Sequence, residues 1–263
     1  MIVTLWLCVQ ALAAEPDHSA LLATELTQAW DVLADQTEPA HYLALTLTRE
    51  ERISIGATAA TRSWSNEQDS TWLDVDLRVG TAELDSTHQL RGFSALDGDS
   101  RMVLSVPHDG EYAIRTAIRR EIDQQYRDHA ERIVMIRANQ RVKIEEEDSA
   151  HDFSPTRAGV VNHAPPPPLA LDIASWEGVL ARLSAQVEES EVVHDSSVSL
   201  TAIRVTRTFV DSEAARLVHG RLAALAGAEK SKDENPRAVH VRALLRRISG
   251  RSPWDGENEP RSV

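Results

Sequence analysis

The sequence is poor in the residues that build disulfides, thiolate metal centres and phosphate-binding surfaces. Cys8 is the single cysteine among 263 residues, so the sequence supports neither a disulfide framework nor a cysteine ligand set. Only 28 Lys and Arg stand against 41 Asp and Glu, a net charge of −13. Because nucleic-acid binding needs a basic face, we expect no nucleic-acid partner and take the acidity as a source of solubility.

The apolar N-terminal stretch falls short of a membrane span. Residues 2–14 are apolar apart from Thr4 and Gln10, whereas a membrane helix needs roughly 20 residues. Ala11-Leu12-Ala13 has the small-x-small form of a signal-peptidase site. We therefore expect residues 1–14 to be a signal peptide, no membrane span, and a periplasmic or secreted protein. The alternative is a buried N-terminal helix, since no Lys or Arg precedes Arg49.

Known catalytic motifs are missing as well. The sequence contains no His-Glu-x-x-His pair, glycine-rich phosphate loop, Gly-x-Ser-x-Gly elbow or Ser-x-x-Lys. His151 and His163 lie twelve residues apart in expected loops without a third ligand nearby. Asp74 and Asp76 alternate along an expected strand, where a solvated face explains them better than a catalytic pair. We accordingly predict no catalytic, metal-binding or cofactor-binding residue, and no cofactor.

Hydrophobic periodicity predicts a helix followed by strands in the first part of the chain. Leucines at helical spacing indicate a helix over residues 18–35. Alternating apolar residues predict strands over 41–48 and 52–61, with a hairpin at residues 49–51. A third strand over 71–79 alternates strictly, which is typical of an antiparallel sheet with one wet face. Residues 80–100 read as a loop, and residues 101–107 as a short strand.

A long helix is expected over residues 109–143. Its apolar stripe consists of Ile114, Ile118, Ile122, Tyr126, Ala130, Ile133 and Val134. Three pairs of opposite charge at i,i+4 have the favourable orientation: Glu111/Arg115, Asp123/Arg127 and Asp128/Arg132.

A proline-rich segment divides the chain after an acidic loop. Pro165 to Pro168 favour a stiff, extended spacer, and a recognition ligand is the less favoured reading. Asp172 or Ser175 then caps a further helix, and a last strand covers residues 196–210. The fold class expected is α+β: a mostly antiparallel sheet packed by a long helix, with a second helix–strand segment after the polyproline linker.

The order of these segments resembles the N-terminal half of exported bacterial proteins of the TldD/PmbA family of candidate metallopeptidases. The resemblance is carried by residues 73–92, by residues 114–130 with Asp123 and Tyr126 three apart, and by "DFSP" at 152–155. It continues with "PPPPLALDIASWEGVLARLS" at 165–184 and "RTFVDSEAARL" at 207–217. It implies an α+β domain at 15–147, a loop and linker at 148–171, a continuation of the same domain at 172–225 and a polar tail at 226–263.

The resemblance also implies what this chain does and does not do. In the family the metal site is a His-Glu-x-x-x-His helix with a later Cys in the C-terminal half, and nothing here matches it. We therefore expect a non-catalytic domain that is inactive alone, helps to build a substrate chamber and forms a homo- or heterodimer with a TldD/PmbA-like subunit. The alternative is an exported, non-enzymatic binding or assembly module that partners a full-length homologue.

Two departures from the family pattern stand out near the C-terminal end. Asp211 replaces the usual Asn, and Ala214 replaces the usual Gly. Because Ala resists the positive φ that Gly permits, the turn after Glu213 is not secured by the sequence. The resemblance stops beyond Leu225, which favours a truncated or frameshifted gene over a natural stand-alone domain as the expectation.

Overall fold

The computed structural model describes residues 18–58, 61–88, 104–107, 110–140, 151–154, 159–188 and 195–231. They form three helices and a six-stranded, mostly antiparallel sheet, which confirms the expected α+β class. In chain order the elements are α1 (His18–Leu33), β1 (Ala40–Thr58), β2 (Thr61–Val79), β3 (Leu104–Val106), α2 (Glu111–Gln140), β4 (Val161–Ala164), α3 (Ile173–Glu188), β5 (Asp195–Asp211) and β6 (Arg216–Ser231). The expected signal peptide, including Cys8, lies outside the described residues.

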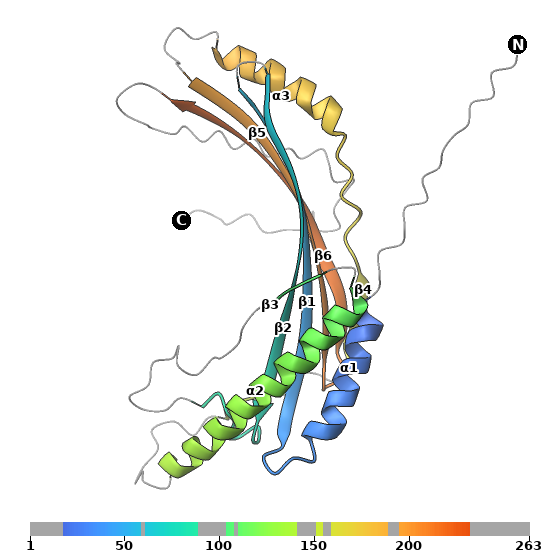
Figure 1. Ribbon diagram of the computed structural model, residues 1–263, viewed down its shortest axis with the longest axis vertical. Coiled ribbons are helices and arrows are strands. Elements are labelled where there is room, and N and C mark those ends of the chain that lie inside the picture. The colour runs from blue at the N-terminus through green and yellow to red at the C-terminus, as the bar shows by residue number, and fades with distance from the viewer. Residues whose placement is uncertain are drawn as a thin grey trace, which may run out of the picture.

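Four very long strands dominate the sheet. The strand order is β3-β2-β1-β5-β6-β4, and β4 alone pairs in parallel, with the start of β6. The long strands bow along their length, with α1 and α3 on the outer side of the bend at opposite ends (Figure 1). Among the described helices, none is both long and apolar enough to cross a membrane.

The hairpin expected at Arg49–Glu51 is wrong, because β1 runs straight through these residues. The chain reverses instead between Thr58 and Thr61. Side chains of opposite charge on the neighbouring strands let the strand continue: Arg49 Nη2 lies 2.7 Å from Asp69 Oδ2, and Glu51 pairs with Arg204. A charged triplet predicted a turn, but cross-strand ion pairs made it the middle of a strand.

Two hydrophobic cores lie on the same face of the sheet. Odd-numbered β1 residues share that face, since side chains alternate along a strand. Leu43, Leu45 and Leu47 join the larger core under α1 and α2, whereas Ile55 and Ala57 join the smaller core under α3. The sheet therefore has one face covered by helices and one face that no described helix covers.

The long helix α2 packs as expected, with one shift in its stripe. Ile114, Ile118 and Ile133 are fully buried, whereas Val134 is 53% exposed. The buried stripe instead runs on through Gln125, His129 and Ile136, together with Glu121. These polar side chains were not expected inside, and Gln125 Nε2 is accommodated by donating to the Val75 carbonyl at 3.1 Å.

The last helix packs on the far end of the sheet, and the linker before it packs on the middle. Asp172 caps α3, because its Oδ1 accepts from the Ser175 amide at 3.2 Å. Pro166 is buried above Gly220, where an added Cβ would lie 2.8 Å from Pro166 Cγ. The strand β6 continues to Ser231, so the polar tail expected from residue 226 begins, at the earliest, six residues later.

Candidate functional site

The uncovered face of the sheet presents two rows of side chains at its centre. The strand register places Asp74, Thr46, Phe209 and Leu217 side by side in one row. The next row holds Trp72, Thr48, Arg207 and His219 in the same strand order. Along each strand these residues alternate with residues that fill the larger core. Because the alternate residues are buried on one face, these side chains must point to the open face.

These eight residues line a hollow of about 620 Å³ on the open face of the sheet. Because α1 and α3 lie on the outer side of the bend (Figure 1), the open face is its inner side. Its apolar surface comes from Trp72, Phe209 and Leu217, and polar groups surround them. Arg207 and His219 are exposed, and the three apolar side chains are half-buried. A concave site with aromatic walls and a few polar groups is the usual form of a ligand-binding surface.

The hollow offers two kinds of recognition and no assembled metal site. Trp72 and Phe209 can stack on apolar or aromatic groups, and the Thr46 and Thr48 hydroxyls can donate or accept hydrogen bonds. Arg207 adds a cation suited to a carboxylate. Among the described residues, no group of three His, Cys, Asp or Glu could hold a metal ion.

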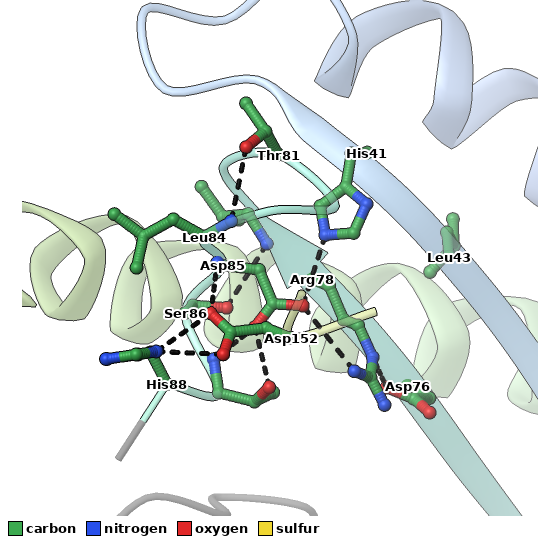
Figure 2. A network of polar contacts seen from close by, with 12 residues as sticks. His41, Leu43, Asp76, Arg78, Thr81, Leu84, Asp85, Ser86, His88 and Asp152 are labelled. Carbon is green, nitrogen blue, oxygen red and sulfur yellow. Dashed lines mark hydrogen bonds and ion pairs between the residues drawn. The ribbon is translucent and has the colours of Figure 1, made fainter. Parts of the chain in front are cut away.

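A second polar network closes one end of the sheet around Asp85 (Figure 2). Gly80, with φ of +120°, turns the chain out of β2, and the carboxylate of Asp85 becomes fully buried. Thr87 donates to Asp85 Oδ1 twice, from its amide at 2.7 Å and its hydroxyl at 2.6 Å. His41 Nε2 lies 3.2 Å from Asp85 Oδ2, and Arg78 Nη1 lies 3.5 Å from it.

The network keeps Asp85 ionised although it is buried. Burial raises the pKa of a carboxyl, but the hydrogen bonds of His41 and Thr87 and the charge of Arg78 outweigh it and lower the pKa of Asp85 to about 2. The neighbouring backbone is fixed as well, because Arg132 Nε donates to the Ser86 carbonyl at 2.6 Å. This arrangement anchors a loop to α2 and leaves the carboxylate no open side for a substrate.

Residues far apart in sequence meet at this end of the sheet. The Asp85 amide donates to Asp152 Oδ2 at 2.9 Å, and His88 Nδ1 lies 2.8 Å from Asp152 Oδ1. Phe153 packs against Tyr42 of β1, with ring centroids 4.8 Å apart and the ring planes tilted by 42°. Asp85 and His88 from one matched segment thus contact Asp152 from another, although the two segments lie far apart in the sequence.

The turn between β5 and β6 completes the same end. Ser212 Oγ accepts from the Leu43 amide at 3.1 Å, and the Ser212 amide donates to the Leu43 carbonyl at 2.8 Å. Asp211 Oδ1 accepts from the Ala215 amide at 2.8 Å, and burial raises the pKa of Asp211. Ala214 adopts φ of +67°, so the turn keeps a left-handed residue with Ala in place of Gly.

The residues singled out from the sequence lie apart from one another. Asp74 lines the hollow, and Asp76 lies next to Arg78 Nε at 3.5 Å on the same face, as expected of an outward strand face. His163 was expected in a loop, but it belongs to β4, because residues 161–164 pair with the start of β6. His151 directly precedes the Asp152 contact. The sequence reasoning gave no role to Phe209, His219 or Asp85; their only signals were strand alternation and the Asp-Ser-Thr turn after β2.

Comparison with known proteins gives distant structural likenesses and no sequence match. No family model and no curated protein matches the sequence. Solved structures similar to this chain include a candidate modulator of DNA gyrase from Thermotoga maritima, at 8% identity and a TM-score of 0.42. A candidate modulator of DNA gyrase from Bacteroides thetaiotaomicron is similar at 9% identity and a TM-score of 0.43. TldE from Thermococcus kodakarensis is similar at 10% identity and a TM-score of 0.42.

These neighbours are TldD/PmbA-family structures, the family that the sequence motifs resemble. Each alignment covers 82% of this chain but only 41%, 42% and 40% of the respective neighbour. The chain thus spans about two fifths of the length of these proteins. At 8–10% identity, the likenesses assign no activity, partner or site to this chain.

Proposed function

We propose that this chain is a non-catalytic N-terminal domain of a TldD/PmbA-like metallopeptidase and that it binds unfolded polypeptide on its open sheet face. The order of the matching sequence segments supports the family. Three of these segments contribute residues to one end of the sheet, through Asp85, Asp152 and Ser212. The alternative, an exported binding or assembly module of a full-length homologue, would use the same surface.

The observation that carries the binding function is the hollow between Trp72 and Phe209. An unfolded polypeptide offers apolar side chains for the aromatic walls and backbone amides for the hydroxyls of Thr46 and Thr48. Arg207 would attract acidic side chains or a chain terminus. Weak, sequence-tolerant binding is expected, because the hollow is open and most of its walls are apolar.

The binding test uses fluorescein-labelled, reduced and carboxymethylated α-lactalbumin as the unfolded polypeptide. Fluorescence anisotropy measures its Kd with the wild-type chain and with Trp72→Ala and Phe209→Ala. We expect each substitution to weaken binding about tenfold, the scale of one lost aromatic contact. Trp64→Ala is the matched control, since Trp64 lies over Gly56 at the other end of the same face and is 46% exposed. Absence of binding would reject the open face as the site, and an equal effect of Trp64→Ala would reject the hollow between Trp72 and Phe209.

The non-catalytic part of the proposal has its own test. A catalytic zinc needs three protein ligands and an open position, and the sequence contains no His-Glu-x-x-x-His helix to supply them. The full chain is soaked in zinc, desalted, analysed for bound metal and assayed on the same polypeptide. We expect neither retained zinc nor cleavage, and stoichiometric zinc with chelator-sensitive cleavage would overturn this part.

Export remains a proposal founded on the N-terminal apolar stretch. Mass spectrometry of the protein made in a bacterial host should find a mature N-terminus at Ala14 or Glu15 in the periplasm. An intact Met1 in the cytoplasmic fraction would contradict it. We also propose that the chain assembles with a TldD/PmbA-like subunit, of its own kind or another.

A further inference from the structure

The two long edges of the sheet differ in how they are protected. On one side, β3 pairs with β2 only at Thr71–Leu73, and β2 itself carries Glu67, Asp69, Asp74, Asp76 and Arg78. On the other side, β4 pairs with β6 only at Arg216–His219. Among the described residues, no strand pairs with the outer edge of β6 from Gly220 to Ser231.

The middle of this edge, between Arg221 and Glu229, lacks the features that keep sheet edges apart. Natural edges carry charges, prolines or bulges, because unpaired N–H and C=O groups attract another strand. The run Leu222–Ala228 has no charged residue and no proline, and its pairing with β5 continues without a register shift. Leu225 is 51% exposed on the open face. The helix α3 packs on β1 and β5.

We propose that a second copy of this chain pairs antiparallel with this edge of β6, so that two sheets become one. This inference names the partner and contact for the assembly part of the proposed function. A second copy is favoured because Ala223, Ala224 and Gly227 are too small to form a pocket that would recognise the side chains of a different protein. Backbone pairing of an edge with itself needs no such pocket.

The register follows from symmetry. A twofold axis normal to the sheet keeps the open faces of both copies on one side, so it passes midway between one residue of β6 and the same residue of the second copy. Centring it on Leu225 uses the whole edge from Gly220 to Lys230 and sets Leu225 opposite Leu225 of the second copy. It also sets Ala223 opposite Gly227. The larger cross-strand apolar contact favours this centre over its neighbour at Ala226, where Leu225 would face Gly227.

Engineered cysteines test the register in the full chain with Cys8 replaced by Ser. Opposite residues of an antiparallel pair lie within the Cα range of a disulfide. We expect Leu225→Cys to cross-link with itself under mild oxidation, and Ala223→Cys to cross-link mainly with Gly227→Cys when the two are mixed. A Cβ at Gly227 meets only ordinary contacts, so that variant folds. Gln68→Cys, exposed on the opposite edge, is the control and should remain uncross-linked.

Sedimentation equilibrium tests the interface itself. We expect a wild-type dimer, and a Kd raised at least about tenfold by Leu225→Lys, which sets like charges across the pair. A wild-type monomer, or a dimer unaffected by Leu225→Lys, would overturn the inference, as would cross-linking through Gln68→Cys. The Leu225→Lys variant is also assayed with the labelled polypeptide, because retained binding by a monomer separates this inference from the binding function.

Discussion

The two ends of the sheet are built from the same strands but are not equally supported. Of the twelve largest fully buried side chains among the described residues, only Ile55, Leu180 and Leu200 belong to the core under α3. The others lie under α1 and α2. Since burial of apolar surface is the main stabilising term, the α1–α2 end should hold the fold and the α3 end should open first.

Ion pairs widen this difference. Glu25 of α1 is 2% exposed. Its carboxylate accepts hydrogen bonds from Arg115 Nη1 and Arg119 Nε of α2, each at 2.6 Å. Burial raises the pKa of Glu25, but the two arginines outweigh it and the net shift is downward. Both helices are thereby fixed to one another as well as to the sheet. The α3 end rests instead on its small core, its cap and the linker.

The largest effect is expected from a charge in the larger core. Val75 is fully buried, so Val75→Asp would place an unpaired carboxylate there and lower the free energy of unfolding by more than about 4 kcal/mol. Urea unfolding measures it. Gln68→Asp, exposed on the same strand, should change stability by less than about 0.5 kcal/mol. A urea midpoint unmoved by Val75→Asp would contradict the core assignment.

A substitution in the smaller core should separate the two ends. Leu180 is 1% exposed, and Leu180→Ala should cost about 2–3 kcal/mol. Hydrogen exchange should quicken in α3 and in the adjoining part of β5 while α2 keeps its protection. Leu183→Ala, on the same helix with Leu183 43% exposed, serves as the control. Equal loss of protection in α2 would show one cooperative unit and disprove the comparison.

Acid should weaken the larger end through Asp85. Its pKa is lowered from 3.8 to about 2 in the folded chain, so unfolding takes up a proton between these values. The ionised carboxylate therefore contributes about 2 kcal/mol above pH 4, and this is lost as the pH falls to 2. Urea unfolding from pH 5 to pH 2 measures the slope. Asp85→Asn should flatten it, and an unchanged slope in that variant would assign the acid sensitivity elsewhere.

The smallest expected effect is a gain at the turn between β5 and β6. Ala214 has φ of +67°, which costs a non-glycine residue about 1 kcal/mol. Ala214→Gly should therefore stabilise the chain by about that amount, seen as a higher urea midpoint. Ala223→Gly, within β6, should act in the opposite direction because Gly weakens strands. Destabilisation by Ala214→Gly would mean that the Ala214 methyl group stabilises the fold by more than its backbone strain costs.

The helices and strands with a strong hydrophobic period could be predicted from the sequence. Where each of them begins and ends depended on the adjacent strands. The strict alternation of residues 71–79 indicated the end of β2, but residues 61–70 gave no such signal and are strand because β1 pairs with them. The charged triplet at Arg49 had the composition of a turn. Its partners Asp69 and Arg204 lie on other strands, so a local pattern could not reveal them.

The candidate site was beyond sequence reasoning for a related reason. Trp72 belongs to β2, Phe209 to β5 and His219 to β6, and only the sheet register sets them in adjoining rows. Alternation could say that each points away from the core. It could not say that they point into one hollow, because that depends on strand order and on the bend of the sheet.

The sequence by itself determined the local preferences: the α1 and α2 stripes, the Asp172 cap, the alternation of β1, β2 and β5, and the absence of a His-Glu-x-x-x-His helix. Each of these is set by residues within a few positions of one another. Tertiary structure decided where the long hairpin reverses, which face stays open, which edge stays unpaired, and that Asp85 meets Asp152. Those features arise from pairing between distant segments, whose free energy depends on burial and hydrogen bonding that exist only once the sheet has formed.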